Sequence, residues 1–194
     1  MFSILRDPKE RIASFYFYLL KEAKKLSESD LNKPEHIGKR IILERSADDY
    51  FFGGDDAWRA FILDHFDNVY CRYFGSQRIR AGQRFSSLRD RRKLRSAFNN
   101  LGKIDWIYSI DNLGALEADL AELYGFDLNF SEARTNVGDR PVHEKRWPSL
   151  LANFERDASR TEIERFVKLD SQLIPKGAVS DSFVLSGIPL AALI

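Results

Sequence analysis

The stretch FSILRDPKERIASFYFYLL, residues 2–20, decides how this chain is interpreted, because it joins a short apolar run directly to an amphipathic segment. The run Phe2-Ser3-Ile4-Leu5 is too short for a helix and is followed at once by a helix start. It therefore predicts a buried β-strand over 2–5. The segment behind it predicts a helix over 8–26.

The start of that helix is marked by local capping signals. Asp7 stands at the N-cap, Pro8 at the first helical position and Glu10 at the third, an arrangement that resembles a capping box. The apolar residues that follow recur at helical spacing and predict a single buried face. They are Ile12, Phe15, Tyr16, Leu19, Leu20 and Ala23.

The same stretch contains a candidate phosphate site, R-D-P-x-E-R-x-x-S, from Arg6 to Ser14. It puts an arginine at the carboxyl end of a strand and just before a helix N-terminus, where open α/β sheets bind ligands. A helix N-terminus favours anions, and a guanidinium can bind a phosphate through two hydrogen bonds. Helix capping, with Arg11 paired to Glu10 or Asp7, accounts for the same residues, so spacing alone leaves both interpretations open.

The rest of the chain alternates between helical patterns and polar or glycine-containing stretches. We expect mostly loop over 27–54 with a short helix at 39–44, irregular structure over 67–86 and a loop-rich region over 126–156. Asp105 to Ile110 (DWIYSI) reads as a second buried strand. Further helices are predicted from Asp55 or Asp56 to Phe66, over 90–101, from an Asp111 cap to Tyr124 with Leu113, Leu116, Leu120 and Leu123 inward, and over 161–174.

Strands that alternate with helices indicate an α/β fold with a parallel sheet and flanking helices. We expect one helix-rich domain over 1–178, followed by an apolar tail over 179–194. Two convincing strands are too few to complete such a sheet. We therefore expect the domain to be truncated at its N-terminal side, with the missing strand supplied by an upstream segment or a partner chain.

The composition of the chain excludes several classes of function and of binding site. The 194 residues carry a formal net charge of +1 and 44% hydrophobic residues, which is typical of a globular protein that does not bind polyanions through bulk charge. The single cysteine, Cys71, excludes an internal disulfide and a cysteine-rich zinc site. No apolar run is long enough to span a membrane and no secretion signal is recognisable, so we expect a cytoplasmic location.

One segment, residues 78–95, is strongly basic, with eight cationic side chains and one carboxylate, Asp90. Arg84, Arg91 and Arg92 are candidates for binding a sulfated or carboxylated glycan. A solvated surface paired with acids elsewhere explains the charge equally well. Nucleic acid is a weaker candidate partner, because no recognised nucleic-acid module accompanies the segment.

The remaining polar clusters favour structural roles. The three histidines, His36, His65 and His143, are too scattered to predict a metal site. His143 lies in a loop beside two cations and is a weak candidate for an active-site position. A cation site in the acidic cluster Asp48, Asp49, Asp55 and Asp56 is less favoured than helix capping and solvation.

The motif between Arg6 and Ser14 resembles the 3′-phosphate-binding segment of the sulfotransferases that use 3′-phosphoadenosine-5′-phosphosulfate (PAPS), especially the uronyl and heparan 2-O group. Weaker similarity continues in order through FDNVYCRYFGS (66–76), the run 94–125, a loop at 136–141 and EIERFVKLDSQLIPKGA (162–178). The resemblance implies a P-loop NTPase-like fold. It also implies transfer of a sulfuryl group to a hydroxyl, on a carbohydrate acceptor in this group.

The resemblance also implies roles for particular residues. Arg6 and Ser14 would bind the 3′-phosphate of PAPS or of its product PAP, and Asn136 and Arg140 would lie in the loop that closes over the nucleotide. The family's lysine-bearing phosphosulfate loop and its catalytic base precede the motif, whereas five residues precede Arg6 here, and no such loop follows. The alternative function is therefore a catalytically incomplete fold that binds nucleotide or acidic glycan. An open strand at 2–5 would also favour pairing with a second copy.

Overall fold

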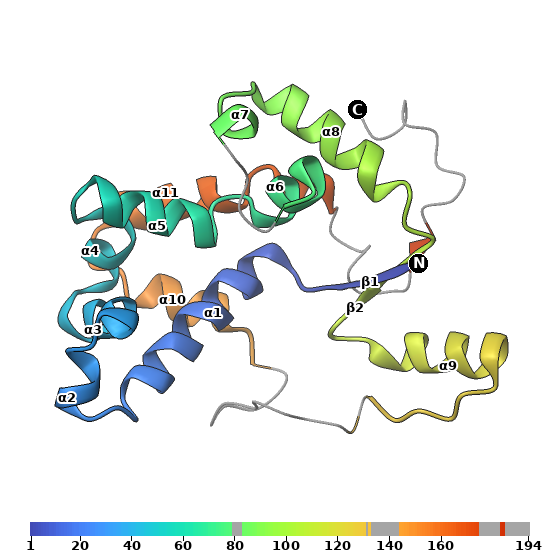
Figure 1. The fold of residues 1–194 in the computed structure, drawn as a ribbon, viewed down its shortest axis with the longest axis horizontal. Coiled ribbons are helices and arrows are strands. Elements are labelled where there is room, and N and C mark those ends of the chain that lie inside the picture. The colour runs from blue at the N-terminus through green and yellow to red at the C-terminus, as the bar shows by residue number, and fades with distance from the viewer. Residues whose placement is uncertain (79–82, 131, 133–143, 175–182, 185–194) are drawn as a thin grey trace. The chain divides into compact units, whose positions relative to one another are not determined.

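The computed structural model describes residues 1–78, 83–130, 132, 144–174 and 183–184. Among these residues the fold is rich in helix, with three short strands (Figure 1). The strands are β1 (Phe2–Leu5), β2 (Trp106–Ser109) and β3 (Phe183–Val184). The helices are α1 (Pro8–Ala23), α2 (Glu28–Leu31), η1 (Pro34–His36), α3 (Ile37–Glu44), α4 (Ala47–Phe52), α5 (Asp56–Phe66), α6 (Val69–Ser76), α7 (Gln83–Ser86), α8 (Asp90–Leu101), α9 (Leu113–Tyr124), α10 (Arg146–Ala152), α11 (Asp157–Glu162), η2 (Ile163–Val167) and α12 (Asp170–Leu173).

The chain divides into two compact units, and each contains residues that are distant in sequence. The first unit comprises Met1–Asp7, Asn68–Val137 and Lys168–Ile194, and it holds the strands. The second unit comprises Pro8–Asp67 and Gly138–Val167 and is helical where described. The expectation of one domain over 1–178 stays a prediction.

The sheet of the first unit is built on a parallel pair. β1 runs parallel to β2 with Leu5 opposite Ser109, and β3 pairs antiparallel on the other side of β2. A parallel pair needs a long crossover connection, which the helices between residues 5 and 106 supply. This confirms a helix-rich α/β arrangement at a coarse level, and the P-loop NTPase-like fold stays a prediction.

The core of the first unit lies where α6, α8 and α12 pack with the strands. Ser96 and Asn100 of α8 donate hydrogen bonds to the carbonyl oxygens of Gly75 and Phe74, at 2.8 Å each, near the end of α6. These two bonds satisfy carbonyl groups that a helix end would otherwise leave without a partner. The buried apolar residues of this core are Leu5, Cys71, Phe74, Ala97, Phe98, Leu101, Ile104, Ile107, Leu169, Leu173 and Ile174.

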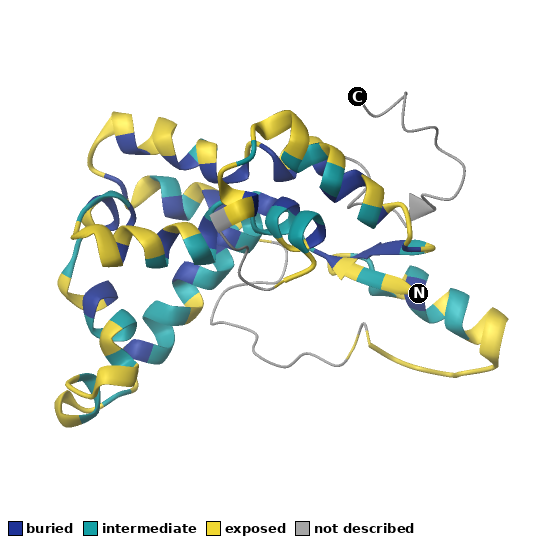
Figure 2. Ribbon diagram, turned by 45° about the horizontal axis from the view of Figure 1, so that its top comes forward, coloured by how far each residue is buried: buried dark blue, intermediate teal, exposed yellow. Residues whose placement is uncertain are grey.

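The core of the second unit is dense in aromatic rings. Tyr16 of α1, Tyr50 and Phe51 of α4 and Phe66 of α5 form edge-on and tilted pairs with centroids 5.0–6.2 Å apart. Such geometry adds to the stabilisation that comes from burying the rings. α1 packs against α3 and α10, and buried positions recur along its length (Figure 2).

Elements that carry their own start and stop signals are confirmed. β1, α1, α5, α8 and β2 occur within three residues of their predicted bounds. Asp55 caps α5 by accepting a hydrogen bond from the backbone N–H of Trp58 at 2.8 Å. Gly125 ends α9 with φ +68°, a left-handed conformation that glycine adopts without strain.

Other predictions of secondary structure are wrong. Residues 27–54 are largely helical, and 67–86 contain α6 and α7. The single helix predicted over 161–174 is divided among α11, η2 and α12. The N-cap of α9 is Asn112, one residue beyond the predicted Asp111.

Two predictions of burial also need correction. Phe2 and Ile4 of β1 are 47% and 42% exposed, so the strand is buried only at Leu5. In α9, Leu116 is buried as predicted, but Leu123 is 52% exposed. The last turn of α9 extends beyond the packed part of the first unit, as the exposed colouring of Figure 2 shows.

Candidate functional site

Arg6 follows the last residue of β1, and its backbone is held by Tyr70 of α6. The Arg6 N–H donates to the Tyr70 hydroxyl oxygen at 3.1 Å, and that hydroxyl donates to the Arg6 carbonyl oxygen at 3.1 Å. One phenol therefore satisfies both main-chain groups of Arg6. No local sequence signal indicates this contact, because the two residues are 64 positions apart.

This position is the carboxyl edge of the parallel pair. The Ile110 N–H donates to the Leu5 carbonyl at 2.9 Å, so β2 also ends beside Arg6. Buried Ser109 accepts a hydrogen bond from the Asp111 N–H at 3.0 Å, which turns the chain away from the strand. Ligands of open α/β sheets bind at this edge. The strand-arginine-helix order predicted from sequence is therefore present.

Ser14 lies in the second turn of α1 and is half-buried. Its hydroxyl oxygen accepts a hydrogen bond from Nη1 of Arg146, the first residue of α10, at 3.1 Å. No sequence motif assigns a role to Arg146. The contact joins residues 132 positions apart, and no local pattern indicates it.

Glu10 connects the same two helices. Its carboxylate accepts hydrogen bonds from the backbone N–H groups of Arg146 at 2.8 Å and Trp147 at 3.1 Å. Glu10 and Ser14 are four residues apart and so share a face of α1. The carboxylate predicted to cap its own helix thus caps α10.

The residues expected to bind the cofactor are distributed over both units. Arg6 belongs to the first unit and Ser14 to the second, so each is placed here by the contacts within its own unit. Asn136 and Arg140, expected in the nucleotide loop, lie outside the described residues, as does His143.

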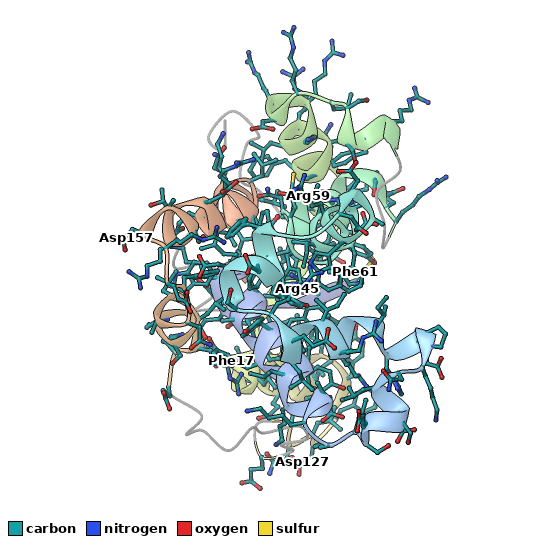
Figure 3. All side chains as sticks on the ribbon, turned by 90° about the vertical axis from the view of Figure 1, so that its left-hand side faces the viewer. Phe17, Arg45, Arg59, Phe61, Asp127 and Asp157 are labelled. Carbon is teal, nitrogen blue, oxygen red and sulfur yellow. The ribbon has the colours of Figure 1, made fainter. Side chains whose placement is uncertain are left out.

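The candidate acceptor residues are exposed side chains of α7 and α8 in the first unit. Arg84 is exposed in α7, and Arg91 and Arg92 are exposed in the first turn of α8. Figure 3 shows side chains with nitrogen at their tips fanning out from α8 into solvent. We define the basic surface as Arg84, Arg89, Arg91, Arg92, Lys93 and Arg95.

The basic surface is not neutralised by the acids that the structure describes. In the part of the chain that the structure describes, its six cations have no carboxylate within ion-pair distance. Asp90, the only acid in the segment, pairs with Lys168 at 3.3 Å. The alternative of a surface paired with acids elsewhere therefore finds no support among the described residues.

The acidic cluster has structural roles. Asp48 is 2% exposed and accepts hydrogen bonds from the backbone N–H of Glu155 at 2.8 Å and from Nε of Arg156 at 3.1 Å. Asp49 pairs with Arg156 and Asp56 with Arg59. Within the described ranges, no group of three or more His, Cys, Asp or Glu side chains is arranged to hold a metal ion.

The two described histidines also serve the fold. Nδ1 of His65 lies 2.7 Å from the Phe61 carbonyl oxygen, and its ring stacks on Phe15 with centroids 6.2 Å apart. Nδ1 of His36 lies 2.9 Å from the Asp30 carbonyl oxygen. The contacts of His65 with Phe61 and Phe15 favour a structural role for its ring.

Comparison of the chain with protein-family models, with curated proteins and with solved structures found no match. In the described part of the chain, no helix has both the length and the apolar character needed to cross a bilayer.

Proposed function

We propose that this chain carries the 3′-phosphate-binding part of a PAPS-dependent sulfotransferase that acts on a hydroxyl of a carbohydrate. The observation that carries the proposal is the position of Arg6 at the carboxyl edge of a parallel strand pair, directly before the helix that contains Ser14. Arginine and a hydroxyl donate the hydrogen bonds that a phosphate monoester accepts.

The surroundings of Arg6 favour a binding role. Tyr70 holds the Arg6 main chain at 3.1 Å on both its N–H and its carbonyl, which reduces the conformational freedom lost when a ligand binds. Asn136 and Arg140 would complete the nucleotide site from the loop that the family resemblance assigns to it.

The basic surface supports an acidic acceptor. Its cations lack carboxylate partners among the described residues, so a sulfated or carboxylated glycan would supply the missing counter-charges. Arg84, Arg91 and Arg92 are the proposed acceptor-binding residues. Their exposed positions permit contact with an extended chain.

A second candidate function is binding without turnover. Sulfuryl transfer requires a base for the acceptor hydroxyl and donors that stabilise the departing bridging oxygen. The printed sequence contains no lysine-bearing glycine-rich loop that would supply those donors. On this alternative, the chain binds PAP or an acidic glycan and transfers nothing.

Calorimetric titration with PAP tests the binding claim. We expect the wild-type protein to bind PAP and Arg6→Ala to bind at least about tenfold more weakly, because one charge-assisted contact is lost. Arg59→Ala, at an exposed arginine of α5, is the matched control and should bind like wild type. Equal affinity of Arg6→Ala and wild type would remove Arg6 from the site.

Radiolabelled PAPS separates the two candidate functions. Transfer of label to an acidic polysaccharide, lost in Arg6→Ala and retained in Arg59→Ala, would identify an enzyme. Binding of PAP without any transfer would identify the non-catalytic alternative.

A further inference from the structure

We propose that the acceptor is a linear anionic polysaccharide that lies lengthwise along the exposed face of α8. Arg95 and Asn99 are further binding residues, and they continue the surface that begins in the first turn of this helix. The inference deepens the proposed function and rests on it for the carbohydrate nature of the ligand. It makes the length of the acceptor chain part of its recognition.

α8 has one buried face and one exposed face. Its buried face carries the apolar residues that share a core with α6. Its exposed polar side chains recur at intervals of three or four residues, so they are neighbours on one face of the helix. They are Arg91, Arg92, Arg95 and Asn99. We call the three arginines the arginine row, and it runs parallel to the helix axis because four residues of helix rise by about 6 Å.

α6 holds the two helices that carry the basic surface. Ser96 and Asn100 of α8 each donate a 2.8 Å hydrogen bond to a carbonyl oxygen near the end of α6. The buried Phe85 ring of α7 packs closely on Gly75 of α6, where a Cβ would lie 2.4 Å from the ring. The backbone positions from which the arginines extend are therefore set by packing, so a ligand meets a row that is already formed.

The arginine row has no acidic partner among the described residues. Other helices place an acid at helical spacing from an exposed cation. Arg40 pairs with Glu44 within α3 at 3.7 Å, and Arg59 pairs with Asp56 within α5 at 3.7 Å. In α8, the residues three and four positions before Arg95 are arginines instead. Like charges at these intervals destabilise a helix, so the row costs stability in the free protein and bound anions would offset that cost.

The surroundings of the arginine row favour a polysaccharide over other polyanions. A guanidinium binds an anionic oxygen group through paired hydrogen bonds, and the Asn99 amide can donate to and accept from a sugar hydroxyl. The aromatic rings of α7 and α8, Phe85 and Phe98, are buried, so the described part of these helices exposes no ring on which a nucleic-acid base could stack. The same part exposes no large apolar side chain, which insertion into a membrane surface would require. A hydrated chain of charged sugars fits these features.

Fluorescence anisotropy with labelled dextran sulfate tests the inference. Wild type should bind it, and glucose 6-sulfate should compete at least about a hundredfold less well, because one sulfate cannot contact the whole row. Arg95→Ala should weaken binding about fivefold and reduce the slope of log K against log salt concentration by about one, because one ionic contact is lost. Lys93→Ala, at a half-buried cation of the same helix, is the matched control and should change the slope little. Equal effects of the two variants would show that only bulk charge matters.

A structural role for Arg95 gives a different result. Arg95→Gln removes the repulsion with the neighbouring arginines, so the free variant should melt at the same temperature as wild type or higher. Dextran sulfate should raise the melting temperature of wild type more than that of Arg95→Gln. Asn99→Ala should weaken binding but leave the salt slope unchanged, because an amide carries no charge. A less stable Arg95→Gln, or equal stabilisation of wild type and variant by dextran sulfate, would overturn the inference.

The outcomes also separate this inference from the proposed function. Tighter binding of polyuridylate than of dextran sulfate would assign the surface to nucleic acid and refute the inference. A protein that binds PAP but not dextran sulfate would leave the 3′-phosphate site standing and remove the acceptor surface. Binding of dextran sulfate without binding of PAP would overturn the proposed function and leave a polysaccharide-binding surface on α8.

Discussion

Asp48 shows how a buried charge is maintained in the second unit. Burial acts to raise the pKa of its carboxyl, but hydrogen bonds from Ser159, from the Glu155 N–H and from the side chain and backbone of Arg156 outweigh it and lower the pKa to about 2. These donors come from the segment after α10, more than 100 residues away in sequence. The carboxylate therefore ties that segment to α4.

The lowered pKa predicts that the folded state loses stability in acid. Because the pKa is lower in the folded than in the unfolded chain, whose value is about 3.9, the stabilisation is fully present well above pH 4 and is lost as the pH falls toward about 2. The difference corresponds to roughly 2 kcal/mol. Urea unfolding between pH 7 and pH 2 should show this loss in wild type but not in Asp48→Asn. Asp49→Asn, whose carboxylate is exposed, should follow wild type.

Two buried tyrosines predict opposite effects of removing a hydroxyl. The Tyr50 hydroxyl is buried without a hydrogen-bond partner among the described residues, whereas the Tyr108 hydroxyl donates to Asp119 at 2.6 Å. Tyr50→Phe should leave the free energy of unfolding unchanged or raise it, and Tyr108→Phe should lower it by about 1 kcal/mol. Chemical denaturation measures both. A clear loss of stability in Tyr50→Phe would show that its hydroxyl has a partner.

At the scale of elements, α6 and α12 cap each other reciprocally. Asn68, in a left-handed conformation with φ +43°, accepts hydrogen bonds from the N–H groups of Leu169 at 2.6 Å and Asp170 at 3.3 Å. Asp170 in turn accepts from the N–H groups of Tyr70 at 3.1 Å and Cys71 at 2.7 Å. Since Tyr70 holds Arg6, this pair of caps also supports the proposed site.

Breaking this pair should be costly. Asp170→Asn keeps the size of the side chain but replaces the charged acceptor, and we expect it to lower the free energy of unfolding by about 2 kcal/mol. Ser171→Ala, at the exposed neighbouring position, should have little effect. Equal stability of the two variants by thermal or urea unfolding would show that the Asp170 contacts contribute nothing net.

The same reciprocal caps explain why α6 and the break before α12 were not predicted from the sequence. α1 and α5 can be predicted from sequence because helix-start residues stand at their N-termini. These residues are Asp7 and Pro8 for α1 and Asp55 for α5. α6 has no local cap of that kind, because its first N–H groups are satisfied by Asp170, 100 residues later. Between η2 and α12, the N–H of Leu169 donates a hydrogen bond to the Asn68 side chain. The spacing of apolar residues in this segment does not indicate that contact.

In the candidate site, too, some residues are indicated by local sequence and others are brought in only by tertiary contacts. The positions of Arg6 and Ser14 follow from a motif within nine residues and could be predicted. Tyr70 and Arg146 reach these residues only through tertiary packing, so nothing near them in sequence indicates the contact. Local signals identify the motif residues, and the structure adds the residues that hold them.

At the scale of the whole molecule, β1 offers an edge for association. It pairs with β2 on one side, and among the described residues no strand pairs on its other side. Phe2 and Ile4 are exposed on it. Exposed apolar edge strands favour pairing with another chain, so association with a second copy is expected.

Sedimentation velocity over a range of concentrations tests this expectation. Wild type should sediment faster as the concentration rises, and Ile4→Lys should shift the protein to monomer, because charged side chains on an edge strand oppose pairing. Tyr18→Lys, at an exposed aromatic position of α1, is the matched control and should associate like wild type. A wild-type protein that remains a single monomeric species throughout would refute the expectation.

Recognition of a 3′-phosphate can be tested with the wild-type protein alone. Calorimetric titrations with PAP and with 5′-AMP differ only in that phosphate. We expect PAP to bind at least about tenfold more tightly, because Arg6 would contact the additional phosphate. Equal affinities for the two nucleotides, or no binding of either, would contradict it.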